Sequence, residues 1–275
     1  MHSEPVTATA PRPVRTALLA QDWRYVTFLH WAVDPDAVAP LLPAGTRPDL
    51  HAGRTYVGLV AFRMVRVGPP HLPLPYLGTF DETNVRVYSV DRYGRRGVVF
   101  LSLDAARLLP VLVGRYLTRL PYRWAAMRVR RADGLVRYVS RSRWPGRGVR
   151  SVLTVRPGAR IAEPTALEHF LTARWGLHTR IAGRTRYLPN VHQTWPLHRA
   201  ELVEQDGGLL DGYGLGTAGA APISVLWAPG VSVRFGRPLR PHPTDPRDGT
   251  SDTRTSGQGA QCGEGPASER VDDSR

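Results

Sequence analysis

Four polar side chains recur at every second position of one segment, and together they could bind and polarise a small molecule. Residues 80–88 read Phe-Asp-Glu-Thr-Asn-Val-Arg-Val-Tyr. Side chains of a β-strand alternate between two faces, so Glu82, Asn84, Arg86 and Tyr88 would share one face and the β-branched residues the other. A carboxylate, an amide, a guanidinium and a phenol in one row predict the polar wall of an internal cavity. The alternative is a strand face exposed to solvent.

Each member of this row suits a particular role. The planar guanidinium of Arg86 can pair with a carboxylate or an oxyanion of a ligand. Glu82 is the candidate catalytic residue, as a general acid or base if burial raises its pKa. Tyr88 would orient the ligand together with Glu82, and Asn84 would supply hydrogen bonds.

A second candidate segment, residues 188–198, contains two histidines and a tryptophan next to a proline. His192 could titrate near neutral pH and is the second candidate acid or base. Trp195 is predicted to bind ligand by closing the cavity mouth together with His192. The spacing of His192 and His198 matches no standard zinc pattern, so no metal site is predicted.

The chain has no lysine, since all 37 of its basic Lys and Arg residues are arginine. Without a side-chain amine there is no side-chain Schiff base, no lysine base and no lysine of a phosphate-binding loop. Dinucleotide-binding, phosphate-loop and paired-cysteine zinc motifs are also missing, so no cofactor is predicted.

The formal net charge of +14 raises the question of a nucleic-acid partner. The arginines are scattered singly or in pairs along the chain, and residues 241–275 carry seven acidic residues against four arginines. This distribution argues against nucleic acid and favours a small-molecule ligand. The sequence leaves open whether the protein forms a homo-oligomer.

The location expected from the sequence is the cytoplasm. The single cysteine, Cys262, allows no internal disulfide. Residues 1–20 lack the continuous apolar core of a signal peptide, and no run of about 18 apolar residues predicts a membrane span. A membrane partner is therefore not predicted.

The predicted organisation is a disordered leader over residues 1–18, a single domain over 19–240 and a disordered acidic tail over 241–275. Strand signals dominate the domain, at residues 23–33, 56–67, 83–90, 98–103, 122–131, 135–142, 149–155, 178–188, 197–204, 223–227 and 231–235. Helices are predicted at 36–42, with Asp34 as N-cap, at 107–118 and from Glu163 to Trp175. This pattern predicts an α+β fold, a large antiparallel β-barrel with a few outer helices.

Four motifs in this order resemble the bacterial YqjF-like proteins, a family of unknown function in the acetoacetate-decarboxylase-like superfamily. They are Glu-Thr-Asn-Val-Arg-Val-Tyr at 82–88, Val-Phe-Leu-Ser-Leu-Asp-Ala at 99–105, Leu-Pro-Tyr at 120–122 and His-Gln-Thr-Trp-Pro-Leu at 192–197. The resemblance covers residues 19–238 and implies a cone-shaped β-barrel with a central cavity. In acetoacetate decarboxylase a cavity lysine forms a Schiff base, which this chain cannot do. The resemblance carries over one residue, Glu82.

Three functional hypotheses follow. The first is a barrel that binds a small anionic or carbonyl-containing molecule. The second is a decarboxylase, hydratase or hydrolase that works without lysine and uses Glu82 and His192 as acid and base. The third, a basic protein associated with nucleic acid, is the least favoured.

Overall fold

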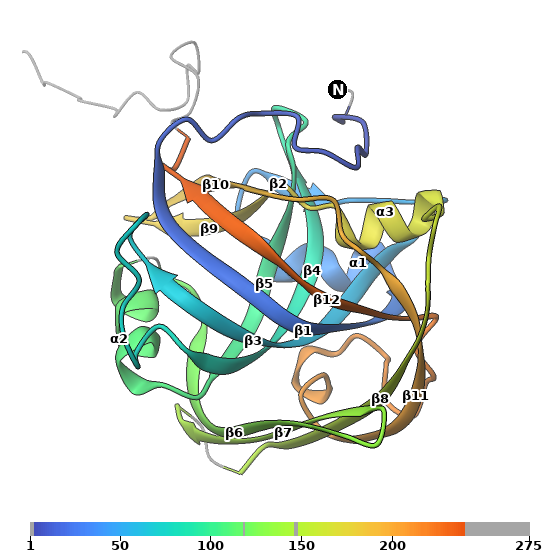
Figure 1. Ribbon diagram of the computed structural model, residues 1–275. Coiled ribbons are helices and arrows are strands. Elements are labelled where there is room, and N and C mark those ends of the chain that lie inside the picture. The colour runs from blue at the N-terminus through green and yellow to red at the C-terminus, as the bar shows by residue number, and fades with distance from the viewer. Residues whose placement is uncertain (1–2, 118, 146–147, 240–275) are drawn as a thin grey trace, which may run out of the picture. The chain divides into compact units, whose positions relative to one another are not determined.

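The computed structural model describes residues 3–117, 119–145 and 148–239, all within the compact unit Met1–Arg240 (Figure 1). The acidic tail expected at 241–275 lies outside the described residues. Strands make up most of the fold and few helices accompany them, which confirms the predicted strand-rich class.

The strands are β1 Ala17–Val33, β2 Thr46–Pro48, β3 Thr55–Gly68, β4 Phe80–Asp91, β5 Arg96–Ala105, β6 Tyr122–Ala132, β7 Leu135–Trp144, β8 Arg150–Arg160, β9 Gly176–Ile181, β10 Arg184–His192, β11 His198–Gly207 and β12 Ser224–Gly236. The α-helices are α1 Pro35–Val38, α2 Leu108–Leu117 and α3 Ala166–Thr172, and the short 3-10 helices are η1 Ala39–Leu41 and η2 Asp211–Tyr213.

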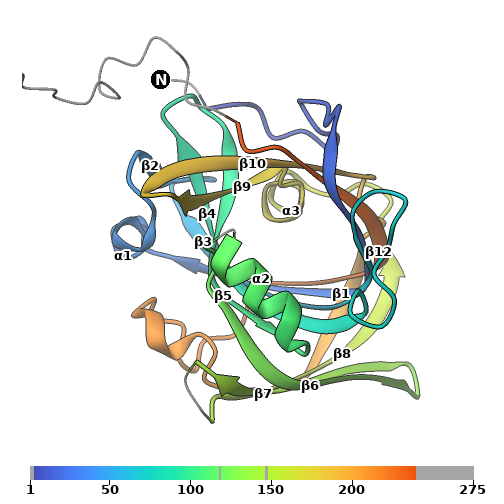
Figure 2. The ribbon, with the colours of Figure 1, turned by 90° about the vertical axis from the view of Figure 1, so that its left-hand side faces the viewer.

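All twelve strands form one sheet, in the order β10-β9-β5-β6-β7-β8-β11-β12-β1-β3-β4-β2. Two further pairings, β10–β12 and β5–β4, connect strands that stand far apart in this order. The sheet is mainly antiparallel, but β5 runs parallel to both β6 and β9, which the sequence did not indicate. Figure 2 shows the strongly curved sheet, with α2 lying across its near side. Closure into a barrel stays a prediction.

Local capping explains where the short helices begin. The Asp34 side chain accepts a hydrogen bond from the backbone N–H of Asp36 at 2.9 Å, and Pro35 occupies the first helical position, as predicted for α1. Helix α3 begins with a capping box between Thr165 and Glu168. It is shorter than the helix predicted from Glu163 to Trp175.

Two strand predictions were wrong in detail, and glycines explain both. The segment predicted as one strand at 178–188 is the hairpin β9–β10, which turns at Ala182 and Gly183 with φ of 49° and 76°. The two strands predicted at 223–227 and 231–235 are the single strand β12. Gly230, with φ of 145°, lies inside it and lets the pairing with β1 continue.

The leader predicted to be disordered at 1–18 makes specific contacts in the structure. The backbone N–H of Glu4 donates to the carbonyl oxygen of Gly94 at 2.9 Å. The indole N–H of Trp175 donates to the carbonyl oxygen of Thr7 at 3.0 Å. Because these bonds satisfy polar groups in the β4–β5 turn and just before β9, residues 3–16 form part of the described fold. From Ala17 onward the predicted leader is already β1.

Strand β4 is buried along its whole length, and its two faces contact different parts of the core. Val85 and Val87 belong to an apolar cluster that includes residues of β1, β3 and β7. On the opposite face, Tyr88 packs in a cluster with Phe170 of α3. The polar row of β4 is therefore held inside the protein, away from solvent.

We expect the Gly230→Ala substitution to lower the free energy of unfolding by roughly 2 kcal/mol. A Cβ atom at this position would overlap the carbonyl oxygen of Trp23 on the neighbouring strand, and its positive φ disfavours any L side chain. Chemical denaturation measures the change. Gly212→Ala is the control, because a Cβ there meets nothing within 4 Å. Equal losses in the two variants would contradict this account of β12.

Candidate functional site

Arg86 is a buried cation that has no carboxylate partner within the described part of the chain. Its side chain is on β4 and only 5% of the residue is exposed. The Nη2 atom donates to the carbonyl oxygen of Leu171 at 3.0 Å and to the hydroxyl oxygen of Tyr88 at 3.5 Å. Among the described residues no Asp or Glu pairs with it, and its Nε atom has no hydrogen-bond partner. A buried charge without a counter-charge is costly, so an anion bound here would be stabilised.

The end of helix α3 supplies the acceptors that hold this region. Carbonyl oxygens at the end of a helix have no partner within the helix. Here those of residues 170–172 accept hydrogen bonds from the Arg174 Nε at 2.7 Å, from Arg86, and from the indole N–H of Trp195 at 3.0 Å. The Tyr88 hydroxyl also donates to one of them, at 2.8 Å. The helix end thus brings residues from β4 and from the segment after β10 to one place.

Glu82 is also buried, and it is protonated near neutral pH. Burial raises its pKa from the ordinary value of 4.5 to about 8, and the charge of Asp104 adds to the rise. Hydrogen bonds from Tyr122, whose hydroxyl is 3.3 Å from the Glu82 Oε2, and from Asn84 act in the opposite direction but do not offset burial. A protonated carboxyl group can donate a hydrogen bond or a proton to a ligand.

His30 was not identified from the sequence, although it lies in the same buried region. It is fully buried, and neither of its ring nitrogens has a hydrogen-bond partner. Strand pairing places His30, Gly58 and Arg86 in one row across β1, β3 and β4. Burial, together with the charges of Arg86 and Arg174, lowers the pKa of His30 well below its ordinary value, so the ring is neutral.

Gly58 leaves the middle of this row without a side chain. A Cβ atom there would lie 3.2 Å from the His30 Nε2 and 3.4 Å from the Tyr88 hydroxyl oxygen. In addition, the side-chain oxygen of Asn84 is buried without a hydrogen-bond partner. Unsatisfied polar atoms from two strands, β1 and β4, therefore accompany the unpaired guanidinium, and buried polar atoms normally have partners.

His192 and Trp195 lie beside each other, as predicted. Their ring centroids are 5.0 Å apart, and the His192 ring also stacks on Trp175 at 4.3 Å. Burial lowers the pKa of His192 to about 4, against the raising effect of its hydrogen bond to the Gln193 carbonyl oxygen, and the charge of Arg86 lowers it further. His192 is therefore neutral at physiological pH.

The structure brings most of the predicted site residues together, but not all. The Phe28 ring connects the two predicted segments, since its centroid is 5.0 Å from that of Trp195 and 5.6 Å from the guanidinium carbon of Arg86. No contact of the described residues joins His192 to Glu82. The acid and base pair of the enzymatic hypothesis therefore has no direct geometric support.

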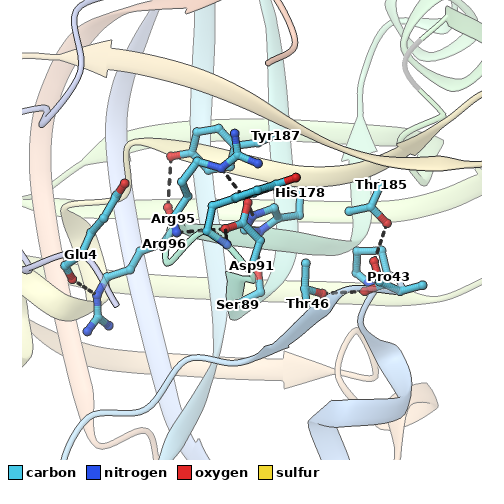
Figure 3. A network of polar contacts seen from close by, with 12 residues as sticks. Glu4, Pro43, Thr46, Ser89, Asp91, Arg95, Arg96, His178, Thr185 and Tyr187 are labelled. Atoms are coloured by element: carbon cyan, nitrogen blue, oxygen red, sulfur yellow. Dashed lines mark hydrogen bonds and ion pairs between the residues drawn. The ribbon is translucent and has the colours of Figure 1, made fainter. Parts of the chain in front are cut away.

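A second polar cluster has the residue types of a hydrolase triad. Figure 3 shows Ser89, His178 and Asp91 in a network that also includes Arg95. The Ser89 Oγ is 2.8 Å from the His178 Nδ1, and the His178 Nε2 is 3.4 Å from the Asp91 Oδ2. Ser89 and His178 are almost completely buried, which keeps a substrate away from them. Asp91 also accepts hydrogen bonds from the backbone and side chain of Arg95, so the cluster stabilises the β4–β5 turn.

The described part of the chain has no group of three or more His, Cys, Asp or Glu side chains arranged to hold a metal ion. Within residues 3–239, leaving aside the few positions not described, no helix has the length and apolarity needed to cross a membrane.

Comparisons with known proteins agree with the motifs found in the sequence. Residues 20–232 match the DUF2071 family, described as an uncharacterized conserved protein. The uncharacterized protein YqjF of Bacillus subtilis (strain 168) is 29% identical over 209 residues, which cover 75% of this chain and 86% of YqjF. The resemblance to the YqjF-like family is thereby confirmed.

Solved structures with a similar fold are acetoacetate-decarboxylase-like enzymes. One from Sphingomonas wittichii RW1 is 12% identical with a TM-score of 0.57, covering 84% of this chain and 96% of that one. Acetoacetate decarboxylase from Legionella pneumophila is 16% identical with a TM-score of 0.53, covering 84% and 92%. The enduracididine biosynthesis enzyme MppR, complexed with pyruvate, is 18% identical with a TM-score of 0.53, covering 84% and 93%. At these identities the similarity concerns the fold alone.

The raised pKa of Glu82 predicts a distinct pH dependence of stability. Between about pH 4.5 and pH 8 the folded protein keeps a proton that the unfolded chain has released, so the free energy of unfolding should fall as the pH rises. The steepest slope from this one group is about 1.4 kcal/mol per pH unit. Glu82→Gln should remove this contribution and therefore be more stable than the unchanged protein at pH 8.

Denaturant unfolding at pH 5, 6.5 and 8 measures this slope. Glu201→Gln is the matched control, because the Glu201 side chain is 62% exposed in a surface ion pair. If Glu82→Gln and Glu201→Gln both keep the slope of the unchanged protein, then Glu82 is not protonated in the fold.

Proposed function

Because this chain belongs to the DUF2071 family, which includes YqjF-like proteins, and has an acetoacetate-decarboxylase-like fold, we propose that it binds a small anionic or carbonyl-containing molecule inside its sheet. The binding region lies between the polar row of β4, the row of His30 and Gly58, and the segment of His192 and Trp195. The sheet would close into a barrel around this region, through the pairings β10–β12 and β5–β4.

The observation that carries the proposal is the buried guanidinium of Arg86, which has no carboxylate partner among the described residues. Arg174, at the same end of α3, is also buried, but it pairs with Asp49 at 2.5 Å. The contrast matters because a buried arginine that pairs with a carboxylate can have a purely structural role. An unpaired one destabilises the fold unless an anion from outside the chain joins it.

The remaining groups suit the other end of such a ligand. The protonated Glu82 would donate a hydrogen bond to a carbonyl oxygen, and Asn84 has an acceptor oxygen still free for a ligand donor. Tyr88 would hold Arg86 in place. Trp195 and the neutral ring of His192 would cover the bound molecule with apolar surface, which strengthens the charge interaction by excluding water.

Binding would proceed without Schiff-base chemistry, because the chain has no lysine side chain. The related fold of MppR has been solved with pyruvate, a small 2-oxo acid that has both a carboxylate and a carbonyl group. Pyruvate is therefore a suitable first probe for this chain.

An enzymatic function is the second candidate, and the pKa of Glu82 favours it. A carboxyl group with a pKa of about 8 is a suitable general acid near neutral pH. Decarboxylation, hydration or hydrolysis with Glu82 and His192 would give a pH-dependent rate that Glu82→Gln abolishes. Ligand binding with no turnover under the same conditions would exclude the enzymatic function and leave ligand binding as the only function of this site.

We expect Arg86→Met to separate ligand binding from stability. The variant should lose affinity for pyruvate by at least about 30-fold, because the counter-charge of the carboxylate is gone. Its own free energy of unfolding should stay equal or rise, since an unpaired buried charge has been replaced by an apolar side chain. Isothermal titration and denaturant unfolding measure the two quantities, and native mass spectrometry of freshly purified protein shows whether a small molecule co-purifies.

Arg174→Met is the matched control. It removes a buried arginine of the same region that has a carboxylate partner, so it should lower the free energy of unfolding by roughly 2 kcal/mol. The proposal fails if both Arg86→Met and Glu82→Gln bind pyruvate, or the co-purified molecule, as the unchanged protein does. It also fails if Arg86→Met destabilises as much as Arg174→Met, since Arg86 would then be a structural residue.

A further inference from the structure

A groove of about 590 Å³ lies on the fold, separate from the buried region of Arg86. It is lined by the start of β1, the end of β12 and the loop between β3 and β4. Its polar lining includes Arg15, Asp22, Arg66, His71, Ser232 and Arg234. A volume of this size is typical of sites for small molecules.

The groove has an excess of positive charge. Asp22 is buried and is held by Arg66, whose Nε is 2.7 Å from the Asp22 Oδ2, and by the hydroxyl of Ser232 at 2.6 Å. Arg15 and Arg234 have no carboxylate partner among the residues that the structure describes. Three guanidinium groups and one carboxylate give these four side chains a net charge of +2.

Backbone strain accompanies two of these side chains. Arg66 and His71 have φ of 56° and 65°, in the left-handed region that disfavours residues other than glycine. A register irregularity between Ala20 and Asp22 lies beside Arg66, where β1 pairs with β3. Strained residues and bulges of this kind concentrate at functional sites, because they orient particular side chains toward the site. Here the strain places a guanidinium and an imidazole on the same groove.

The loop that forms one wall is built to keep its shape. Residues 69, 70 and 73 are prolines, which fix the backbone φ angle. The backbone N–H of Leu74 donates to the carbonyl oxygen of Val67 at 3.0 Å, and that of Gly78 donates to the carbonyl oxygen of Leu74 at 3.0 Å. A wall that is ordered before binding loses little entropy on binding.

We propose that this groove binds the phosphate group of a small organic phosphate monoester. Two net positive charges match the dianion that such a group forms near neutral pH. Arginine side chains bind phosphate oxygens through two parallel hydrogen bonds, and both unpaired arginines line the groove. Pro69, Pro70 and Pro73 give the organic part of the ester an apolar surface.

Isothermal titration with phenyl phosphate and with inorganic phosphate, at about physiological ionic strength, tests this assignment. We expect one phenyl phosphate per chain, bound more tightly than inorganic phosphate. Arg15→Gln and Arg234→Gln should each weaken the binding about tenfold or more. Both positions are exposed, so the variants should fold normally.

Arg128→Gln is the matched control, because Arg128 is an exposed arginine of β6 outside the groove. Its affinity should stay within about twofold of the unchanged protein. Equal losses in all three variants would mean general charge attraction and would overturn the proposal. So would binding to vesicles of phosphatidylcholine with phosphatidic acid but not to phenyl phosphate, since the ligand would then be a membrane surface.

Discussion

The unpaired charge of Arg86 is the constraint on which the arrangement of the interior depends. A guanidinium can be buried at this position only because the end of α3 presents a carbonyl oxygen to it and the ring of Phe28 lies beside it. These dipoles and the ring reduce the cost of burial but do not neutralise the charge. Burial is the main reason that His30 and His192 are neutral, and the charge of Arg86 lowers the pKa of both histidines further.

Much of the site could be predicted from alternation along a single strand. The period of two in residues 80–88 identified Glu82, Asn84, Arg86 and Tyr88 as one face, and the structure buries all four. His30 could not be identified from the sequence, because it joins this site only through the pairing of strands, which places it in one row with Gly58 and Arg86. The carbonyl oxygen that accepts from Arg86 belongs to Leu171, which is 85 residues away in the sequence. No local sequence pattern could therefore predict this hydrogen bond.

The fold shows the same division between local and non-local information. Strand-rich composition, the capped helix α1 and the hairpin β4–β5 followed from residues close together in sequence. The parallel pairing of β5 with β6 and β9 depends on the whole sheet. Asp104 illustrates the limit: it shortly precedes α2 in the sequence, but it lies buried in β5 and forms an ion pair with Arg123.

Gly58 gives the interior a feature that a single mutation could alter. Its missing side chain leaves a gap in which a Cβ atom would lie 3.1 Å from the imidazole ring of His30 and 3.4 Å from the hydroxyl oxygen of Tyr88. One added methyl group would narrow that gap while leaving every charged group in place. If the interior binds a ligand as proposed, alanine or serine at this position would select ligands by size and not by charge, because the charged groups would be unchanged.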